Sequence, residues 1–170
     1  SKSTIGLLWS VGVICEIGIF MLMPKIMARF SLKKILLTSL ALAVIRFSLI
    51  GVAIDSIFMI VLAQTLHAAT FGSFHAASVE VVTQFFNGRH QAKGQAIYNS
   101  VAYGVGGTVG GVAGGFGLQY LGPLADYFGW PYSSGQITFM LAAIFPLIGF
   151  LVIGLGLKLT PQNQTQGMFR

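Results

Sequence analysis

Glu16, Arg46 and His67 are the residues of this sequence that packing alone explains least, because each lies near the middle of a long apolar stretch. A charge at the centre of a bilayer costs at least ~2.5–3.5 kcal/mol, so such a residue persists when it is paired or used. A carboxylate and an imidazole can exchange protons, and a guanidinium can pair with the carboxylate. We therefore expect a Glu16–Arg46 ion pair beside His67, serving either as a proton-coupling site or as a static bridge between helices.

A polar stripe surrounds His67, because Gln64, His67 and Thr70 are spaced three residues apart and share one face of a helix. Phe71 and Phe74 are expected alongside them. Such a stripe is typical of a cavity wall, and it is also compatible with hydrogen bonds between helices. His75 borders the same face about two turns further on and is a further candidate.

The elements that must position these residues are five apolar stretches, which we place at 4–27, 35–54, 57–85, 95–120 and 136–158. Charged residues make up 8% of the chain, against ~25% in soluble domains. About 20 apolar residues cross a ~30 Å hydrocarbon core. The fold class is therefore an all-α polytopic membrane protein, with residues 1–159 forming a helical bundle and 160–170 a disordered cytoplasmic tail.

Depth along these spans brings the three ionisable residues to one level. At a rise of about 1.5 Å per residue, Glu16, Arg46 and His67 lie ~18, ~17 and ~15 Å from a membrane face. In a ~30 Å core these depths are all near the midplane. The three side chains are therefore expected to meet.

Basic residues alternate from one connection to the next, which indicates the orientation in the membrane. The connections after the first and third spans and the segment after the fifth carry Lys25, Arg29, Lys33, Lys34, Arg89, Lys93, Lys158 and Arg170. The positive-inside rule predicts an external N-terminus and a cytoplasmic C-terminus. The net charge of +6 is then a topology signal, and we expect no nucleic-acid partner.

The fourth span is rich in glycine, and Gly107, Gly111 and Gly115 repeat every four residues. Small residues at this spacing let helix backbones approach closely in lipid, so we expect these three glycines to pack against another helix. The sequence shows no nucleophile–base pair, no paired carboxylates and no histidines at metal-ligand spacing. We expect no enzyme activity, no cofactor and no metal.

Four segments resemble the C-terminal half of the major facilitator superfamily. They are Gly-Leu-Leu-Trp-Ser-Val-Gly-Val at 6–13, which leads to Glu16, Val-Ile-Arg at 44–46, Leu-His-Ala-Ala-Thr-Phe at 66–71 and His-Ala-Ala at 75–77. More narrowly, the chain resembles the 3-phenylpropionate permease group of proton symporters, which are relatives of lactose permease. The resemblance implies helices 8 to 12 of a twelve-helix transporter in a bacterial inner membrane. Its implied partners are a small organic solute, protons, the lipid bilayer and a missing N-terminal half.

The resemblance also implies roles for individual residues. Glu16 matches the eighth-helix carboxylate that binds substrate and takes part in proton coupling in lactose permease, Arg46 its ninth-helix arginine and His67 its tenth-helix histidine. Thr70 stands where lactose permease has its main proton-release glutamate. Proton coupling would then rest on Glu16 and His67, or on the missing half. The alternative is a non-transporting membrane module or an inactive truncated product, in which Glu16–Arg46 is a structural clamp.

Overall fold

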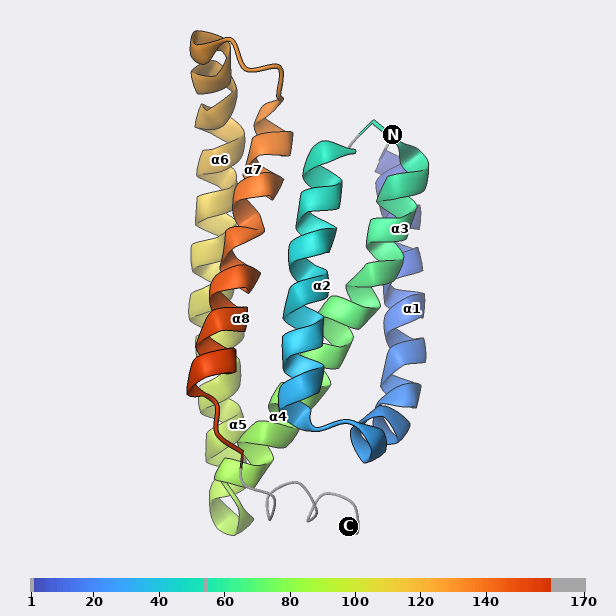
Figure 1. The fold of residues 1–170 in the computed structure, drawn as a ribbon, viewed down its shortest axis with the longest axis vertical. Helices are drawn as coiled ribbons and strands as arrows, with labels where there is room; N and C mark the ends of the chain where they lie inside the picture. Colours follow the sequence, from blue (N-terminus) through green and yellow to red (C-terminus); the bar gives the residue numbers. More distant parts are fainter. Residues whose placement is uncertain (1, 54, 160–170) are drawn as a thin grey trace.

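A computed structural model describes residues 2–53 and 55–159 of the chain, and every regular element within those ranges is helical. The elements are α1 (Lys2–Arg29), α2 (Leu32–Val52), α3 (Ile57–His67), η1 (Ala68–Gly72), α4 (Ser73–Phe85), η2 (Gly88–His90), α5 (Gln91–Asn99), η3 (Ser100–Val105), α6 (Gly106–Phe128), α7 (Ser134–Ala142) and α8 (Ile144–Gly156) (Figure 1). The predicted all-α class is confirmed. The predicted tail at 160–170 lies outside the described residues.

These elements combine into five helical segments that are long and apolar enough to cross a membrane. The segments are Gly6–Arg29, Leu32–Val52, Ile57–Phe85, Gly88–Phe128 and Ser134–Gly156. The fourth extends past the expected 95–120 at both ends. It ends where Gly129 adopts a φ of 67° and its N–H bonds back to the last turn, a left-handed cap that glycine adopts without a steric penalty.

Serine side chains begin three of the spans. The Oγ atoms of Ser31 and Ser56 accept hydrogen bonds from the backbone N–H groups of Lys34 and Met59. Ser133 forms a capping box with Gln136 before α7. Each cap satisfies backbone donors that the first helical turn leaves without a partner, which fixes the residue at which each helix begins.

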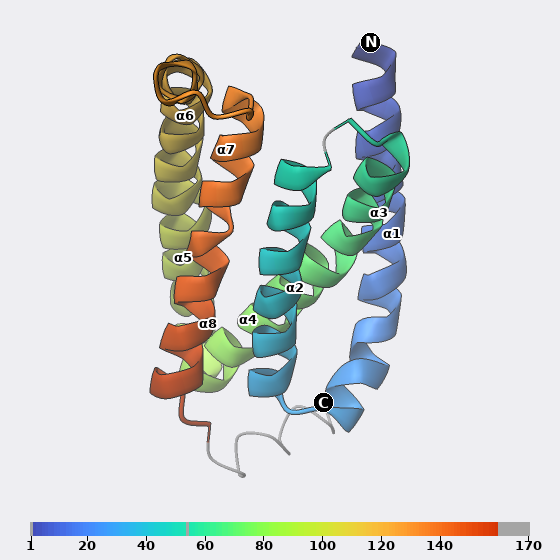
Figure 2. The same cartoon turned by 45° about the horizontal axis from the view of Figure 1, so that its top comes forward.

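The helices are arranged around α2, which lies between two groups (Figures 1 and 2). On one side α1 and α3 run next to each other, and on the other side α7 and α8 pack against α2 with α6 outside them. The third span runs obliquely, so that α3 contacts both α1 and α2 while α4 reaches α5. This oblique span therefore joins the two groups.

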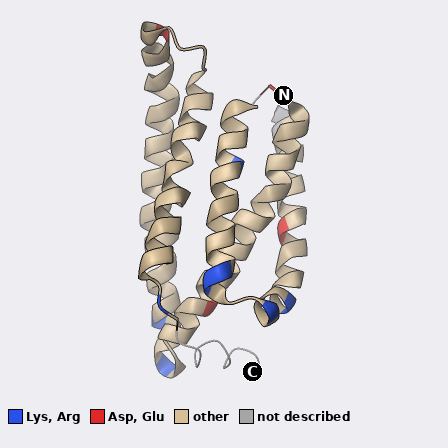
Figure 3. Cartoon of the chain, viewed as in Figure 1, with Lys and Arg blue, Asp and Glu red and all other residues tan. Residues whose placement is uncertain are grey.

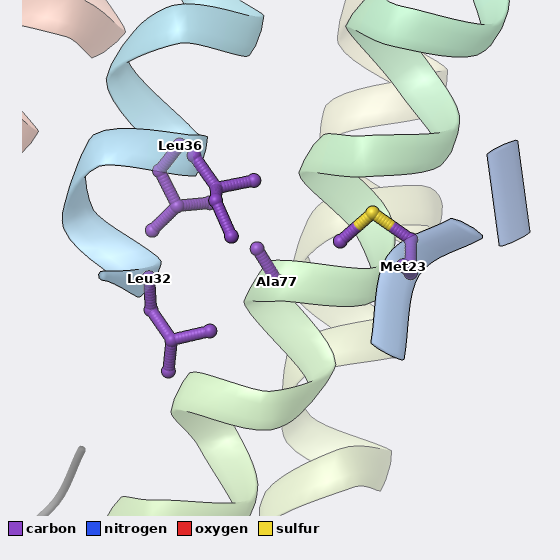
Figure 4. Packing of buried hydrophobic residues seen from close by; sticks show 5 residues of the cluster. Met23, Leu32, Leu36 and Ala77 are labelled. Atoms are coloured by element: carbon purple, nitrogen blue, oxygen red, sulfur yellow. The ribbon is translucent and has the colours of Figure 1, made fainter. Parts of the chain in front are cut away.

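A small apolar cluster fixes α1, α2 and α4 at one end of the bundle (Figure 4). Its buried members are Met23, Leu32, Ile35, Leu36 and Ala77. Phe74, expected alongside the polar stripe, packs against this cluster. Most Lys and Arg residues gather at this end of the molecule (Figure 3), where the Lys33 ammonium donates to the carbonyls of Gly154 and Leu157, at 2.8 Å each.

Candidate functional site

The first and third spans pack side by side through a glycine on each, which sets the level of the candidate residues. A Cβ added at Gly12 would lie 3.4 Å from Gln64 Oε1 and 3.7 Å from His67 Cδ2. A Cβ added at Gly72 would lie 3.3 Å from Glu16 Cγ. Since neither glycine has a side chain, the two helices approach closely. Glu16 is thereby held against Gly72, about one turn further along the span than His67.

His67 is half-buried, and its Nδ1 atom is buried without a hydrogen-bond partner in the described part of the chain. Glu16 lies against Gly72, about one turn after His67, and Arg46 donates to the carbonyl of Ala63, about one turn before His67. The structure therefore places Glu16 and Arg46 each within about one turn of His67 along the third span. An unpaired buried nitrogen carries a desolvation cost of about 1–3 kcal/mol, which a ligand or a water molecule that bonds to it would relieve.

Arg46 does not form the ion pair that its depth suggested. Its Nε donates to the Ala63 carbonyl at 2.9 Å, and its guanidinium carbon lies 5.4 Å from the centroid of the Phe47 ring. No ion pair joins Arg46 to Glu16 among the described residues. The reason is topological: α3 packs against both α1 and α2, so the carboxylate and the guanidinium approach it from different sides.

Two members of the predicted polar stripe differ in what they contact. Gln64 faces Gly12 at the contact between the first and third spans. Thr70 is buried, and its hydroxyl donates to the His67 carbonyl at 3.1 Å. Gln64 thus lies in the contact with α1 beside His67, whereas the Thr70 hydroxyl bonds to the backbone of its own helix.

The third span changes to a π-helix at η1, directly after His67, and its rings stack along one face. The His67 and Phe71 rings lie 5.2 Å apart, and the Phe71 and His75 rings 6.2 Å apart, with interplanar angles of 8° in both pairs. π-Helical segments are rare and often occur at functional sites. The stack places Phe71 between the two imidazoles and makes one continuous aromatic wall.

Two tyrosines of the fourth span complete this wall, and the sequence analysis missed both. The Tyr103 hydroxyl lies 2.7 Å from His75 Nδ1. The Tyr98 ring lies 6.3 Å from both the His75 and Tyr103 rings, and Phe20 of α1 meets His75 edge-on at 6.4 Å. Tyr98 and Tyr103 are five residues apart, a spacing that diverges on an α-helix and converges where the backbone is π-helical, as it is in η3.

The predicted packing glycines face open space in this chain. A Cβ added at Gly107, Gly111 or Gly115 would meet nothing within 4 Å, so the packing expected of them is not made within the described residues. The close contacts of α6 lie elsewhere, at Gly117 and Gly122, where an added Cβ would meet the side chains of Thr138 and Ser134 of α7, with 2.6 Å to Thr138 Oγ1. The neighbouring face of α6 borders an apolar groove of about 1010 Å³, which α7, α8 and Phe47 of α2 also line.

Within residues 2–53 and 55–159, no three His, Cys, Asp or Glu side chains are grouped in a way that could hold a metal ion. The ionisable groups of the candidate site are the Glu16 carboxylate, the two imidazoles and two phenols of the wall, and the Arg46 guanidinium. This set can bind, orient and exchange protons.

Comparison with known proteins gives two relatives and one family. The sequence profile described as "MFS_1 like family" matches residues 1–128. A protein of Escherichia coli (strain K12) named "Probable 3-phenylpropionic acid transporter" is 35% identical over 122 residues, covering 72% of this chain and 32% of the relative. The "Xanthosine permease" of the same strain is 24% identical over 117 residues, covering 67% and 28%. The chain thus spans about a third of the length of these relatives, and no solved structure matches it.

Proposed function

This chain belongs to the MFS_1-like family of major facilitator superfamily transporters, and from that premise we propose that it forms part of a proton-coupled symporter of a small organic solute. The transport cycle would be alternating access, in which two helical units rock about a site near the midplane. Glu16 would alternate between binding a proton and contacting the solute. His67 and Arg46 would set the electrostatic field in which that exchange occurs.

The observation that carries this proposal is the state of Glu16. Its carboxylate has no ion pair with Arg46, and its side chain is fixed against Gly72. A carboxylate at membrane depth is costly unless it is neutralised. Proton binding is the simplest neutralising event, and it couples the charge on this residue to whatever else occupies the site.

The aromatic wall supports a ring-bearing solute. Phe71, at 40% exposure, and Tyr103, at 45%, leave much of their ring surfaces uncovered in this chain. Rings favour offset-stacked or edge-to-face contacts with other rings, worth about 0.5–1.5 kcal/mol each. The name of one relative specifies 3-phenylpropionic acid, which carries both a ring and a carboxylate. We infer a solute of that kind, with the wall contacting the ring.

The chain would act with further helices that are outside this sequence. The open face at Gly107, Gly111 and Gly115 and the apolar groove beside α6 support this, since small residues at this spacing accommodate a closely packed helix. We propose helices 8 to 12 of twelve, with the N-terminal half supplying the opposite wall. The basic end of the bundle (Figure 3) would face the cytoplasm of a bacterial inner membrane, which places the N-terminus outside.

Glu16→Gln in the complete transporter tests the proposal. Reconstituted in liposomes with an imposed proton gradient, it should lose solute uptake by at least about 10²-fold, which corresponds to about 2.7 kcal/mol. Glu80→Gln is the matched control, because the Glu80 carboxylate accepts a hydrogen bond from Gln84 of its own helix and lies outside the aromatic wall. Equal uptake by wild type and Glu16→Gln would contradict the proposal.

The alternative role for the pair, in which Glu16–Arg46 is only a structural clamp and takes no part in coupling, makes a different prediction for the complete transporter. In that case the charge swap Glu16→Arg with Arg46→Glu would restore both folding and proton-driven uptake, because only the attraction would matter. We expect the swap to restore neither, because Arg46 bonds to the Ala63 carbonyl and not to Glu16.

A further inference from the structure

We propose that His75 is the group that releases the transported proton, and that Tyr103 positions its ring for that step. This inference rests on the proposed function and assigns the proton-releasing group, which that proposal leaves open. It is carried by the hydrogen bond between His75 Nδ1 and the Tyr103 hydroxyl, 2.7 Å long and joining the third span to the fourth.

The packing of α1 against the third span places Glu16 between the two imidazoles. Gly12 lies at the level of His67 and Gly72 at the level of Glu16. Phe20, one turn after Glu16, contacts His75 edge-on at 6.4 Å. Glu16 therefore lies about one turn from each histidine along the contact between the two spans.

The surroundings of His75 hold few other charges. Phe20 faces it from α1, Tyr98 from α5 and Tyr103 from η3. The titratable groups beyond these contacts are Glu16, one turn before Phe20 on α1, and His67, two turns before His75 on its own helix. From α2, Arg46 is held at the Ala63 carbonyl, further up the third span. Glu80 is bonded within its own helix. Of these groups, Glu16 is the carboxylate on the helix that contacts His75, so we assign it as the proton donor.

The hydrogen bond to Tyr103 can select which ring nitrogen exchanges the proton. When Nδ1–H donates to the tyrosine oxygen, the lone pair of Nε2 is free, because the partner of one ring nitrogen fixes the state of the other. The Glu16 O–H bond then breaks as the Nε2–H bond forms, leaving a carboxylate and an imidazolium. The Nδ1–H···O bond persists and strengthens with the charge. Release breaks the Nε2–H bond, its electron pair stays on Nε2, and the proton passes to water.

His67 is less suited to this task for two structural reasons. Its Nδ1 is buried without a partner among the described residues, so no hydrogen bond fixes its tautomer. It also lies before Glu16 along the span, further from the basic end where α1, α2 and α4 converge. His75 lies after Glu16, toward the end at which an inward-moving proton would leave.

The test compares two transport modes of the complete transporter in liposomes. Net uptake driven by a proton gradient needs proton release in every cycle, whereas exchange of labelled for unlabelled solute at equal pH does not.

His75→Gln should reduce net uptake at least about tenfold and leave exchange within about twofold. Tyr103→Phe keeps the ring and removes the hydroxyl, so it should preserve exchange and displace the pH profile of net uptake. His90→Gln, in the exposed η2 segment, is the control.

Several outcomes would overturn the inference. His75→Gln with wild-type net uptake would exclude His75 as the releasing group, and an equal loss of both modes would make it a binding or structural residue. An unchanged pH profile in Tyr103→Phe would remove the positioning role, and this variant decides the matter if His75→Gln does not fold. Failure of the proposed function gives a different result from failure of this inference, because uptake by the wild type would then not depend on the proton gradient.

Discussion

The third and fourth spans have the same construction and opposite surroundings. Each is an α-helix interrupted by a π-helical segment, η1 in one and η3 in the other. Gly72 at the end of η1 is buried against α1, whereas the residues of η3 are all exposed. An added Cβ would meet nothing within 4 Å at Gly107, Gly110, Gly111, Gly114 and Gly115, which follow η3. The third span therefore has its packing partners within this chain, and the middle of the fourth does not.

This difference indicates how the site is built. The third span, fixed on both sides by α1 and α2, supplies a rigid wall with His67, Phe71 and His75 in one stack. The fourth span meets that wall through Tyr98 and Tyr103 and through the contact of α4 with α5. A site between a fixed wall and a sparsely held one suits a carrier, since alternating access needs one side to move against the other.

The largest loss of stability is expected in the third span, which forms the fixed wall. Gly72→Val would place a Cβ 2.7 Å from Ile19 Cγ2, a branch close to the α1 backbone that cannot swing away. Overpacking of this kind costs about 1–3 kcal/mol, so the unfolding temperature of the purified protein should fall clearly. Gly107→Val is the matched control, with open space at the same atom. Equal unfolding temperatures for the two variants would mean that the third span is not tightly packed.

The second effect tests the packed end of the fourth span. Gly117→Ala would bring a Cβ to 2.6 Å from Thr138 Oγ1, which already donates to the Ser134 carbonyl. We expect a loss of about 1–2 kcal/mol in the free energy of unfolding, since the threonine must shift and give up that bond. Thr138→Ala removes the obstructing atoms and should recover most of the loss in the double variant. Additive losses would show that Gly117 and Thr138 do not touch.

The third effect concerns the junction between the two spans. Tyr98→Leu removes the ring that lies 6.3 Å from both His75 and Tyr103. An aromatic pair contributes about 0.5–1.5 kcal/mol beyond its buried area, so stability should fall by about 1 kcal/mol and amide exchange in η3 should accelerate. Tyr120→Leu is the control, because the Tyr120 ring stacks with Phe116 of the same helix. Unchanged exchange in η3 would mean that the ring cluster does not hold the spans together.

Apolar length and charge pattern were sufficient to predict the five spans, because crossing lipid requires long helices with every backbone group bonded internally. The Glu16–Arg46 pair was wrong because depth fixes only one coordinate, and the position of α3 between α1 and α2 is a tertiary property. Tyr98 and Tyr103 were missed for a local reason. Side chains five residues apart lie on the same face only where the helix is π-helical, and no residue pattern in the segment predicts a π-helix.

The smallest effect concerns the open face of the fourth span. Gly111→Ala adds a methyl group that meets nothing within 4 Å in this chain, and alanine is favoured over glycine in a helix by up to about 1 kcal/mol. The isolated chain should therefore become slightly more stable to thermal unfolding, or stay unchanged. In the complete transporter the sign should reverse, because a helix packed on that face would be pushed away. Gly6→Ala, on the open surface of α1, should show no such reversal. If Gly111→Ala stabilises both forms equally, the glycine face is exposed to lipid and the fourth span needs no partner there.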